Sequence, residues 1–250
     1  MSEPAQTDFD ASAIDGQNVD AIHDRLREAI LRGVLKPGQE MSQVQLAKQL
    51  GVSRTPLREA LRLLQREGLV DAEFNRRVRV AGFSLVDLEE LYCVRLALEA
   101  TSIRLTTPRL TPEELAELEA AMARMAHFAE EEDYERWEVP HRAFHAGLTA
   151  KAGARATRLL AQLSDHAERY RRLYTLQGSG AWQRGVVQHR KILDAVKARD
   201  ADGAAYWLVV HLARTPLSVI EMVEPTYVPE RLRQVLVELA GAADPPAVGS

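Results

Sequence analysis

The chain has 250 residues, of which 46% are hydrophobic and 27% charged, with a formal net charge of −4 and one cysteine, Cys93. It contains no apolar run of about 18 residues that could cross a membrane, and one cysteine excludes an intrachain disulfide framework. Residues 1–17 are acidic and polar, without the basic start and apolar core of a signal peptide. We therefore expect a cytoplasmic protein that has no membrane partner.

Charge is distributed unevenly along the chain. Residues 36–80 hold nine Lys or Arg and five Asp or Glu, a net charge of +4, which leaves −8 for the remainder. A cationic segment suits a polyanion such as DNA, whereas an acidic remainder limits nonspecific wrapping around it. The charge pattern predicts a DNA-reading head joined to a body with another task.

Residues 42–68 have the pattern of a helix-turn-helix. Ser42 and Gln45 have capping-box spacing for a first helix. Gly51 is expected to end that helix, because glycine adopts the left-handed conformation without a steric penalty. Ser53 then offers its hydroxyl as the N-cap of a second helix.

The second helix separates its side chains into two stripes at about 100° per residue. One stripe is apolar, with Leu57, Ala60, Leu61 and Leu64, and an adjacent one is cationic, with Arg54, Arg58, Arg62, Arg66 and Thr55. A solvated cationic face is the alternative interpretation, but the preceding helix and glycine turn favour docking in the major groove. The expected DNA contacts on this helix are Ser53, Arg54, Thr55 and Arg58.

Two short runs, 69–73 and 77–80, follow the second helix and have the β-branched or alternating pattern of strands. A hairpin between them would present Asn75, Arg76 and Arg77 at its tip, within reach of a phosphate backbone or minor groove. The alternative is a solvent-exposed loop. We predict the hairpin, and therefore a winged helix-turn-helix.

Residues 18–80 resemble the winged helix-turn-helix of the GntR family of bacterial transcription regulators. The resemblance rests on the segments 36–38, 52–61 and 67–70, which read KPG, VSRTPLREAL and EGLV. It implies that Arg54, Thr55 and Arg58 contact bases or phosphates, and that the protein binds double-stranded operator DNA as a homodimer. Two positions depart from the family: Arg77 stands where the wing tip usually has glycine, and Val44 where some relatives have a DNA-contacting arginine.

The remaining body reads as all-helical. Thr111, Pro112 and Glu114 form a strong helix start, with an N-cap, a proline at N1 and a glutamate at N3. A long amphipathic helix entered through Ser84 precedes it, and helix formers continue over 113–131, 134–151, 154–176, 181–199 and 201–224. The predicted fold class is mainly α, an N-terminal winged helix-turn-helix plus a C-terminal all-helical bundle. The predicted domains are a disordered tail (1–17), the winged helix-turn-helix (18–80), a linker (81–85), the all-helical effector-binding and dimerisation domain (86–232) and a C-terminal tail (233–250).

Four histidines lie on predicted helices of the body. His141 and His145 are i,i+4 neighbours, and His189 and His211 lie among apolar residues on two later helices. An i,i+4 pair directs two imidazoles to one place, and histidines from other helices could complete a metal site inside a bundle. Taken singly, each is more often a hydrogen-bonded structural histidine. The spacing alone leaves both interpretations open.

The body also resembles the FCD domain, the helical ligand-sensing domain of the FadR branch of GntR regulators. Phe144-His145, Gln188-His189-Arg190 and His211-Leu212 match positions at which many members bind a metal. The resemblance implies that His145, His189 and His211 are ligands of one divalent transition metal, with zinc and nickel as the leading candidates. The family's aspartate position is His141 here, which is therefore either a fourth ligand or an outer partner.

A metal held by neutral imidazoles keeps its charge uncompensated, so a small carboxylate effector would gain affinity from it. Arg95 is a candidate second clamp on that carboxylate, and an i,i+4 ion pair with Glu99 is the competing interpretation. Cations further along could line the cavity or face solvent: His166, Arg169, Arg171 and Arg172.

We therefore predict a ligand-responsive transcription regulator, a repressor released by a small organic acid, and not an enzyme. The alternatives are a metal-dependent hydrolase or lyase fused to a DNA-binding head, and a sensor of the metal itself. The chain lacks HExxH, a nucleophile elbow and a paired acid and base, which weighs against the enzyme.

Overall fold

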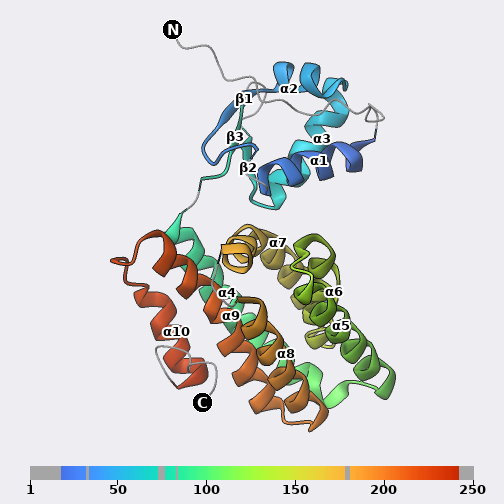
Figure 1. Cartoon of the computed structure of the whole chain (residues 1–250), viewed down its shortest axis with the longest axis vertical. Coiled ribbons are helices and arrows are strands. Elements are labelled where there is room, and N and C mark those ends of the chain that lie inside the picture. The colour runs from blue at the N-terminus through green and yellow to red at the C-terminus, as the bar shows by residue number, and fades with distance from the viewer. Residues whose placement is uncertain (1–17, 32–33, 73–76, 83, 178–180, 242–250) are drawn as a thin grey trace. The chain divides into compact units, whose positions relative to one another are not determined.

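The computed structural model describes residues 18–31, 34–72, 77–82, 84–177 and 181–241. Contacts divide the chain into two compact units between Ser84 and Leu85 (Figure 1). We call the first unit the head and the second the helical domain. Asn75 and Arg76, at the predicted wing tip, lie outside the described residues, as do the predicted tail 1–17 and residues 242–250.

The head combines three helices with a small antiparallel sheet. Its elements are α1 (Val19–Leu31), β1 (Glu40–Ser42), α2 (Gln43–Leu50), α3 (Arg54–Arg66), β2 (Val70–Ala72) and β3 (Arg77–Val80). The strand order is β1-β3-β2, with Met41 opposite Val78 and Val70 opposite Val80. Val78 and Val80 face the core while Arg77 and Arg79 are exposed, as strand alternation requires. The fold class predicted for this unit is confirmed, and α1 and β1 are additions to it.

The turn of the helix-turn-helix forms as predicted, but its serine caps do not. Gly51 has φ 67°, and its N–H bonds the carbonyls that end α2. Ser42 and Ser53 have the extended backbone of N-cap residues, yet neither side chain makes a cap hydrogen bond. Ser42 is also the last residue of β1 and pairs with Arg77, so the sheet fixes its backbone. The capping box expected at Ser42 is therefore wrong.

An ion cluster joins α1 to the residue that follows α3. His23 Nε2 lies 2.6 Å from Glu67 Oε1, and Arg27 Nε donates to Glu67 Oε2 at 3.0 Å. The hydrogen bond to Glu67 raises the pKa of His23 above 6.5 against the opposing effect of burial. Burial pushes the pKa of Glu67 up, but the hydrogen bonds and charges of His23 and Arg27 outweigh it and leave this pKa lowered.

The head should therefore lose stability as the pH rises above the unfolded histidine pKa of about 6.5. A histidine whose folded pKa exceeds its unfolded pKa of about 6.5 stabilises fully below that pH, and this stability disappears as the pH rises through the folded pKa. His23→Gln should remove this component of the pH dependence of thermal unfolding, followed by circular dichroism on the full chain. His127→Gln, at an exposed position of the helical domain, should keep it. Identical pH profiles for the two variants would contradict the assignment.

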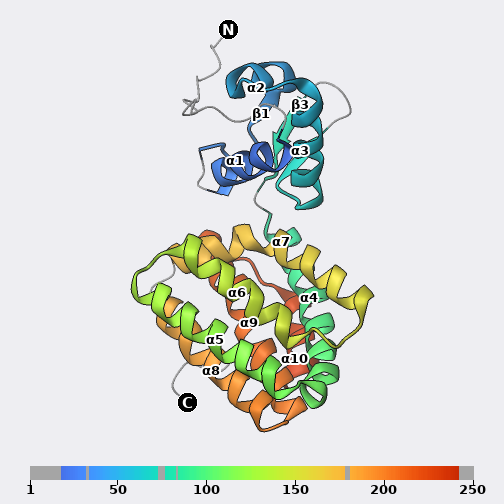
Figure 2. The same ribbon diagram turned by 90° about the vertical axis from the view of Figure 1, so that its right-hand side faces the viewer.

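The helical domain is a bundle with two central helices. Its elements are α4 (Leu85–Thr106), the short 3-10 turn η1 (Thr107–Arg109), α5 (Pro112–Glu130), α6 (Tyr134–Leu148), α7 (Ala154–Gln177), α8 (Ala181–Lys197), α9 (Ala201–Val223) and α10 (Glu230–Ala240). Helices α4 and α9 pack along each other, α7 and α10 contact both, and α8 lies against α5 and α9. Figure 2 shows α5 and α6 side by side. The predicted all-helical body is confirmed.

Capping hydrogen bonds start α5 and α6, the two helices that lie side by side. Thr111 Oγ1 accepts from the Glu114 N–H at 3.3 Å and Glu114 Oε2 accepts from the Thr111 N–H at 2.9 Å, so the predicted capping box is present. Asp133 caps α6 by accepting from the Arg136 N–H at 3.1 Å. A Cβ at Gly147 would lie 2.8 Å from Leu118 Cδ2, so glycine allows α6 its close approach to α5.

The predicted C-terminal tail over 233–250 is wrong where the structure describes it. Residues 230–240 form α10 because Leu232 and Leu236, four residues apart, are buried in the bundle core. The Leu232 N–H donates to Glu89 Oε1 at 3.1 Å, and the Tyr227 hydroxyl donates to Glu89 Oε2 at 2.6 Å. The helical domain thus extends to Ala240.

Candidate DNA interface and metal centre

Helix α3 presents the predicted DNA-contacting residues on its outer face. Leu57, Ala60, Leu61 and Leu64 are buried. At its amino-terminal end, Ser53, Arg54 and Thr55 are exposed, and Arg58 is half-buried one turn later. These positions are the ones that a helix docked in a major groove would direct at base edges and phosphates.

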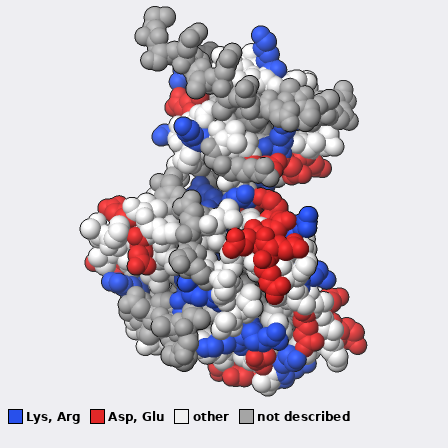
Figure 3. Space-filling model, viewed as in Figure 1, with Lys and Arg blue, Asp and Glu red and all other residues white. Residues whose placement is uncertain are grey.

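Beside this helix, the described part of the wing places one predicted contact at the surface. Arg77 is 71% exposed, and its Nη1 lies 2.8 Å from Glu40 Oε2 on β1. An exposed pair of this kind is weak, so a phosphate could replace Glu40 as the partner of Arg77. Figure 3 shows Lys and Arg side chains at several places on the head and Asp and Glu gathered on part of the helical domain.

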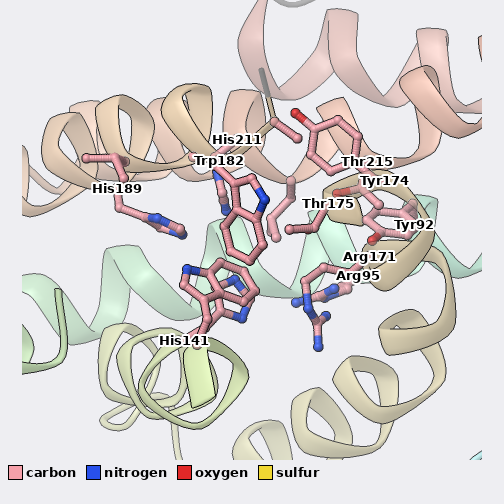
Figure 4. Close-up of a pocket in the computed structure, with 15 residues that line it drawn as sticks. Tyr92, Arg95, His141, Arg171, Tyr174, Thr175, Trp182, His189, His211 and Thr215 are labelled. Atoms are coloured by element: carbon pink, nitrogen blue, oxygen red, sulfur yellow. The ribbon is translucent and has the colours of Figure 1, made fainter. Parts of the chain in front are cut away.

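In the helical domain, the structure brings the four predicted histidines together in the core. His141 and His145 come from α6, His189 from α8 and His211 from α9. Figure 4 shows His141, His189 and His211. Each offers one ring nitrogen within 4.8 Å of the others. The Nε2 atoms of His145 and His189 are 3.3 Å apart. Two nitrogens bound to one tetrahedral zinc, each at about 2.0–2.1 Å, would be separated by about the same distance.

These imidazoles are neutral and have lone pairs available for a metal. Burial is the largest cause of their lowered pKa, which falls to about 3 for His189 and well below 6.5 for the other three. The charges of Arg95 and Arg171 lower the pKa of His141 and His211 further. Neutral imidazole is the form that ligates metals.

The ring nitrogens that face away from the centre have different surroundings. Gln188 Oε1 lies 3.1 Å from His211 Nδ1, and Glu138 Oε2 lies 3.5 Å from His141 Nδ1. Among the described residues, neither His141 Nδ1 nor His145 Nδ1 has a hydrogen-bond partner, so the Glu138 contact is one of charge. Outer oxygen partners of this type fix the tautomer and ring orientation of metal-ligating histidines. The donor set therefore fits a divalent transition metal.

A cavity opens beside three of these histidines. It is lined by His141, His189 and His211 together with aromatic, hydroxyl and guanidinium groups of Tyr92, Arg95, Trp137, Arg171, Tyr174, Thr175, Trp182 and Thr215. Figure 4 shows Arg95 and Arg171 together near Tyr92, with His189 on the opposite side. A ligand in this cavity would meet the histidine nitrogens at one end and two guanidinium groups at the other.

The structure shows the predicted ion pair of Arg95, and the carboxylate clamp stays a prediction. Its Nε donates to Glu99 Oε1 at 3.1 Å, and the side chain also lines the cavity. Both groups of this pair are buried. Burial raises the pKa of Glu99, although the charge and hydrogen bond of Arg95 oppose the shift. Arg95 therefore reaches the cavity already paired with a carboxylate.

Sequence reasoning left Arg171 undecided and missed Glu138, Gln188 and the cavity tryptophans. Glu138 stands three residues before His141, a spacing that places both on one helix face, so this signal was readable. Gln188 and Trp182 reach the site from a different helix than their partners, and helical periodicity contains no signal for such contacts.

Two comparisons with protein families cover most of the chain. Residues 18–80 match the family described as bacterial regulatory proteins, gntR family, and residues 90–214 match the FCD domain. The chain belongs to the GntR family of bacterial transcription regulators. The family resemblance read from the sequence is confirmed in both units.

The relatives of this GntR protein are themselves described as regulators. It is 31% identical to the uncharacterized HTH-type transcriptional regulator BphR of Paraburkholderia xenovorans over 84% of this chain and 90% of that one. It is 28% identical to the HTH-type transcriptional repressor GlaR of Escherichia coli over 78% and 92% of the two chains. The solved structure of E. coli McbR/YncC shares the fold, with a TM-score of 0.68, 24% identity, and coverage of 82% and 97%.

The protein is thus a transcription regulator with a GntR head and an FCD ligand-sensing domain. Its relatives are described as transcription regulators. Among the described residues, none of the helices is both long enough and apolar enough to span a membrane.

Proposed function

We propose that this protein is a homodimeric repressor that leaves its operator when a small organic acid binds beside a metal in the helical domain. The observation that carries the proposal is the convergence of four neutral imidazoles, three buried and His211 half-buried, beside a cavity that also contains two buried guanidinium groups. Polar groups buried this deeply are normally saturated with hydrogen bonds. The nitrogens that these imidazoles offer instead gather within 4.8 Å of one another beside a cavity, which indicates a site built for a ligand.

His145, His189 and His211 would hold the metal, with His141 as the fourth ligand or an outer partner. Imidazole nitrogens select zinc or nickel over magnesium and calcium, which prefer oxygen ligands. When bound, the metal supplies positive charge that four neutral ligands leave uncompensated, and this charge attracts a carboxylate. Arg95 lies in the same cavity and offers its guanidinium as a second contact.

In the head, Arg54, Thr55 and Arg58 would contact bases and phosphates, with Ser53 at the start of α3. Asn75, Arg76 and Arg77 of the wing would contact the backbone or minor groove. One small head buries little DNA surface, so we propose that two heads read the half-sites of a two-fold operator. The helical domain would then contribute to the dimer.

The proposal is tested by measuring the affinity of the protein for the DNA upstream of its own gene. Four conditions are compared: chelated protein, zinc-loaded protein, and each with a panel of organic acids. We expect at least one acid to lower the affinity of the zinc-loaded protein only. Release by metal alone would identify a metal sensor instead. Affinity that is unaffected by metal and by every acid would contradict the proposal.

The recognition-helix assignment predicts the effect of two arginine substitutions. Arg54→Ala and Arg58→Ala should each cost on the order of 1–3 kcal/mol of operator affinity, because each removes a charged contact to a base or phosphate. Thr55→Ala should cost less. Arg136→Ala, which removes an exposed arginine of the helical domain, is the matched control. Unchanged affinity in both head variants, with the fold intact by circular dichroism, would overturn the assignment.

The metal assignment predicts a selective defect in His189→Ala. Removal of one ligand should lower the metal content found by elemental analysis of untagged, reloaded protein, and should weaken the response to effector. DNA affinity without effector should change little, because α8 lies in the other unit. His127→Gln should behave as wild type. Wild-type protein that takes up no stoichiometric metal, and whose thermal stability ignores chelator, would show that these histidines are only structural.

A further inference from the structure

The side chain of Arg171 lines the same cavity as that of Arg95, but one of its buried nitrogens is unpaired among the described residues. Arg171 is 5% exposed, and its Nε and Nη2 donate to the two oxygens of Glu138, the first at 3.2 Å. Its Nη1 is buried and has no hydrogen-bond partner among the described residues. A buried charged donor is rarely left in this state. An anionic oxygen in the cavity would satisfy it.

Glu138 contacts more than this arginine. Its Oε1 accepts from Arg142 Nε at 3.0 Å, and its Oε2 lies 3.5 Å from Nδ1 of His141. Arg142 is fixed in turn by Asp165 and Glu168 of α7, the second at 2.5 Å. One buried carboxylate on α6 therefore touches a candidate metal ligand on its own helix and a cavity guanidinium on α7.

We propose that Arg171 is the guanidinium anchor of the anionic effector, and that Glu138 is a positioning residue that orients both Arg171 and His141. This inference rests on the proposed function. The two-oxygen contact fixes the guanidinium plane and leaves Nη1 as the donor that remains for a carboxylate or similar oxyanion. On its other side, the carboxylate lies 3.5 Å from His141 Nδ1, and its charge favours a proton there rather than on Nε2, which leaves the Nε2 lone pair for the metal.

This arrangement predicts that substitution of Arg171 weakens anion binding alone, whereas substitution of Glu138 weakens both metal binding and anion binding. Cobalt(II) serves as the metal probe, because its visible absorption spectrum reports the ligands around it, and acetate serves as the carboxylate probe. Cobalt affinity is measured by competition with a chelator, and acetate affinity by the spectral change on titration.

Arg171→Met should load cobalt with wild-type affinity and spectrum but bind acetate at least about 10-fold more weakly. Arg171→Lys should do the same while retaining a cationic partner for Glu138, which guards against loss of the fold. Glu138→Gln should lower cobalt affinity by about 10–100-fold, the usual effect of losing an outer partner of a metal ligand, and should weaken acetate binding as well.

Arg172→Met is the matched control. Arg172 is the next residue, pairs with Glu135 at 2.6 Å, stacks on Tyr134, and is absent from the cavity lining. It should change neither affinity. Acetate binding at wild-type strength in both folded Arg171 variants would overturn the anchor, and an unchanged cobalt affinity and spectrum in Glu138→Gln would overturn the positioning role. A wild-type protein that takes up no cobalt would overturn the proposed function and this inference together.

Discussion

The candidate site of the helical domain depends on four imidazoles gathered between three helices, three of them buried and His211 half-buried. Such groups lose their hydration on folding, and burial holds them neutral by lowering the pKa of each. A purely structural core would hold Leu or Phe at these positions, without this desolvation penalty. Neutral nitrogens grouped within 4.8 Å of one another are favourable when a positively charged ion lies between them. The same burial that disfavours protonation prepares the site for a metal.

The cavity beside the histidines combines charge with apolar surface. Trp137 stacks on His141 with ring centroids 4.1 Å apart and meets Trp182 edge-on at 5.4 Å, so aromatic rings cover the histidines on that side. Arg95 and Arg171 are each paired with a buried carboxylate, which avoids an uncompensated charge at the cavity wall. Because the two pairs leave little net charge, the attraction for an anion would come mainly from a bound metal. Hydrogen bonds from the two arginines would then orient the bound anion.

Periodicity and capping chemistry predicted most of the fold. The helices α3 and α5 follow directly from an apolar stripe and from a Thr-Pro-Glu-Glu start, and glycine at position 51 marks the turn. The cap expected at Ser42 fails because Ser42 ends β1, and a three-residue strand carries too little pattern to be predicted. Nothing in the structure explains the missing cap bond of Ser53. Helix α10 was missed although Leu232 and Leu236 have helical spacing. Histidine positions were found by spacing together with family resemblance, whereas the Arg171–Glu138 contact spans 33 residues and two helices, beyond any local pattern.

The central claim, that these four histidines form one metal centre, is tested most directly by X-ray absorption spectroscopy of the zinc-loaded wild-type protein. The account predicts three or four nitrogen ligands at about 2.0–2.1 Å, with the outer-shell scattering of imidazole rings and no sulfur in the first shell. A spectrum dominated by water or carboxylate oxygen, with at most one imidazole, would contradict it.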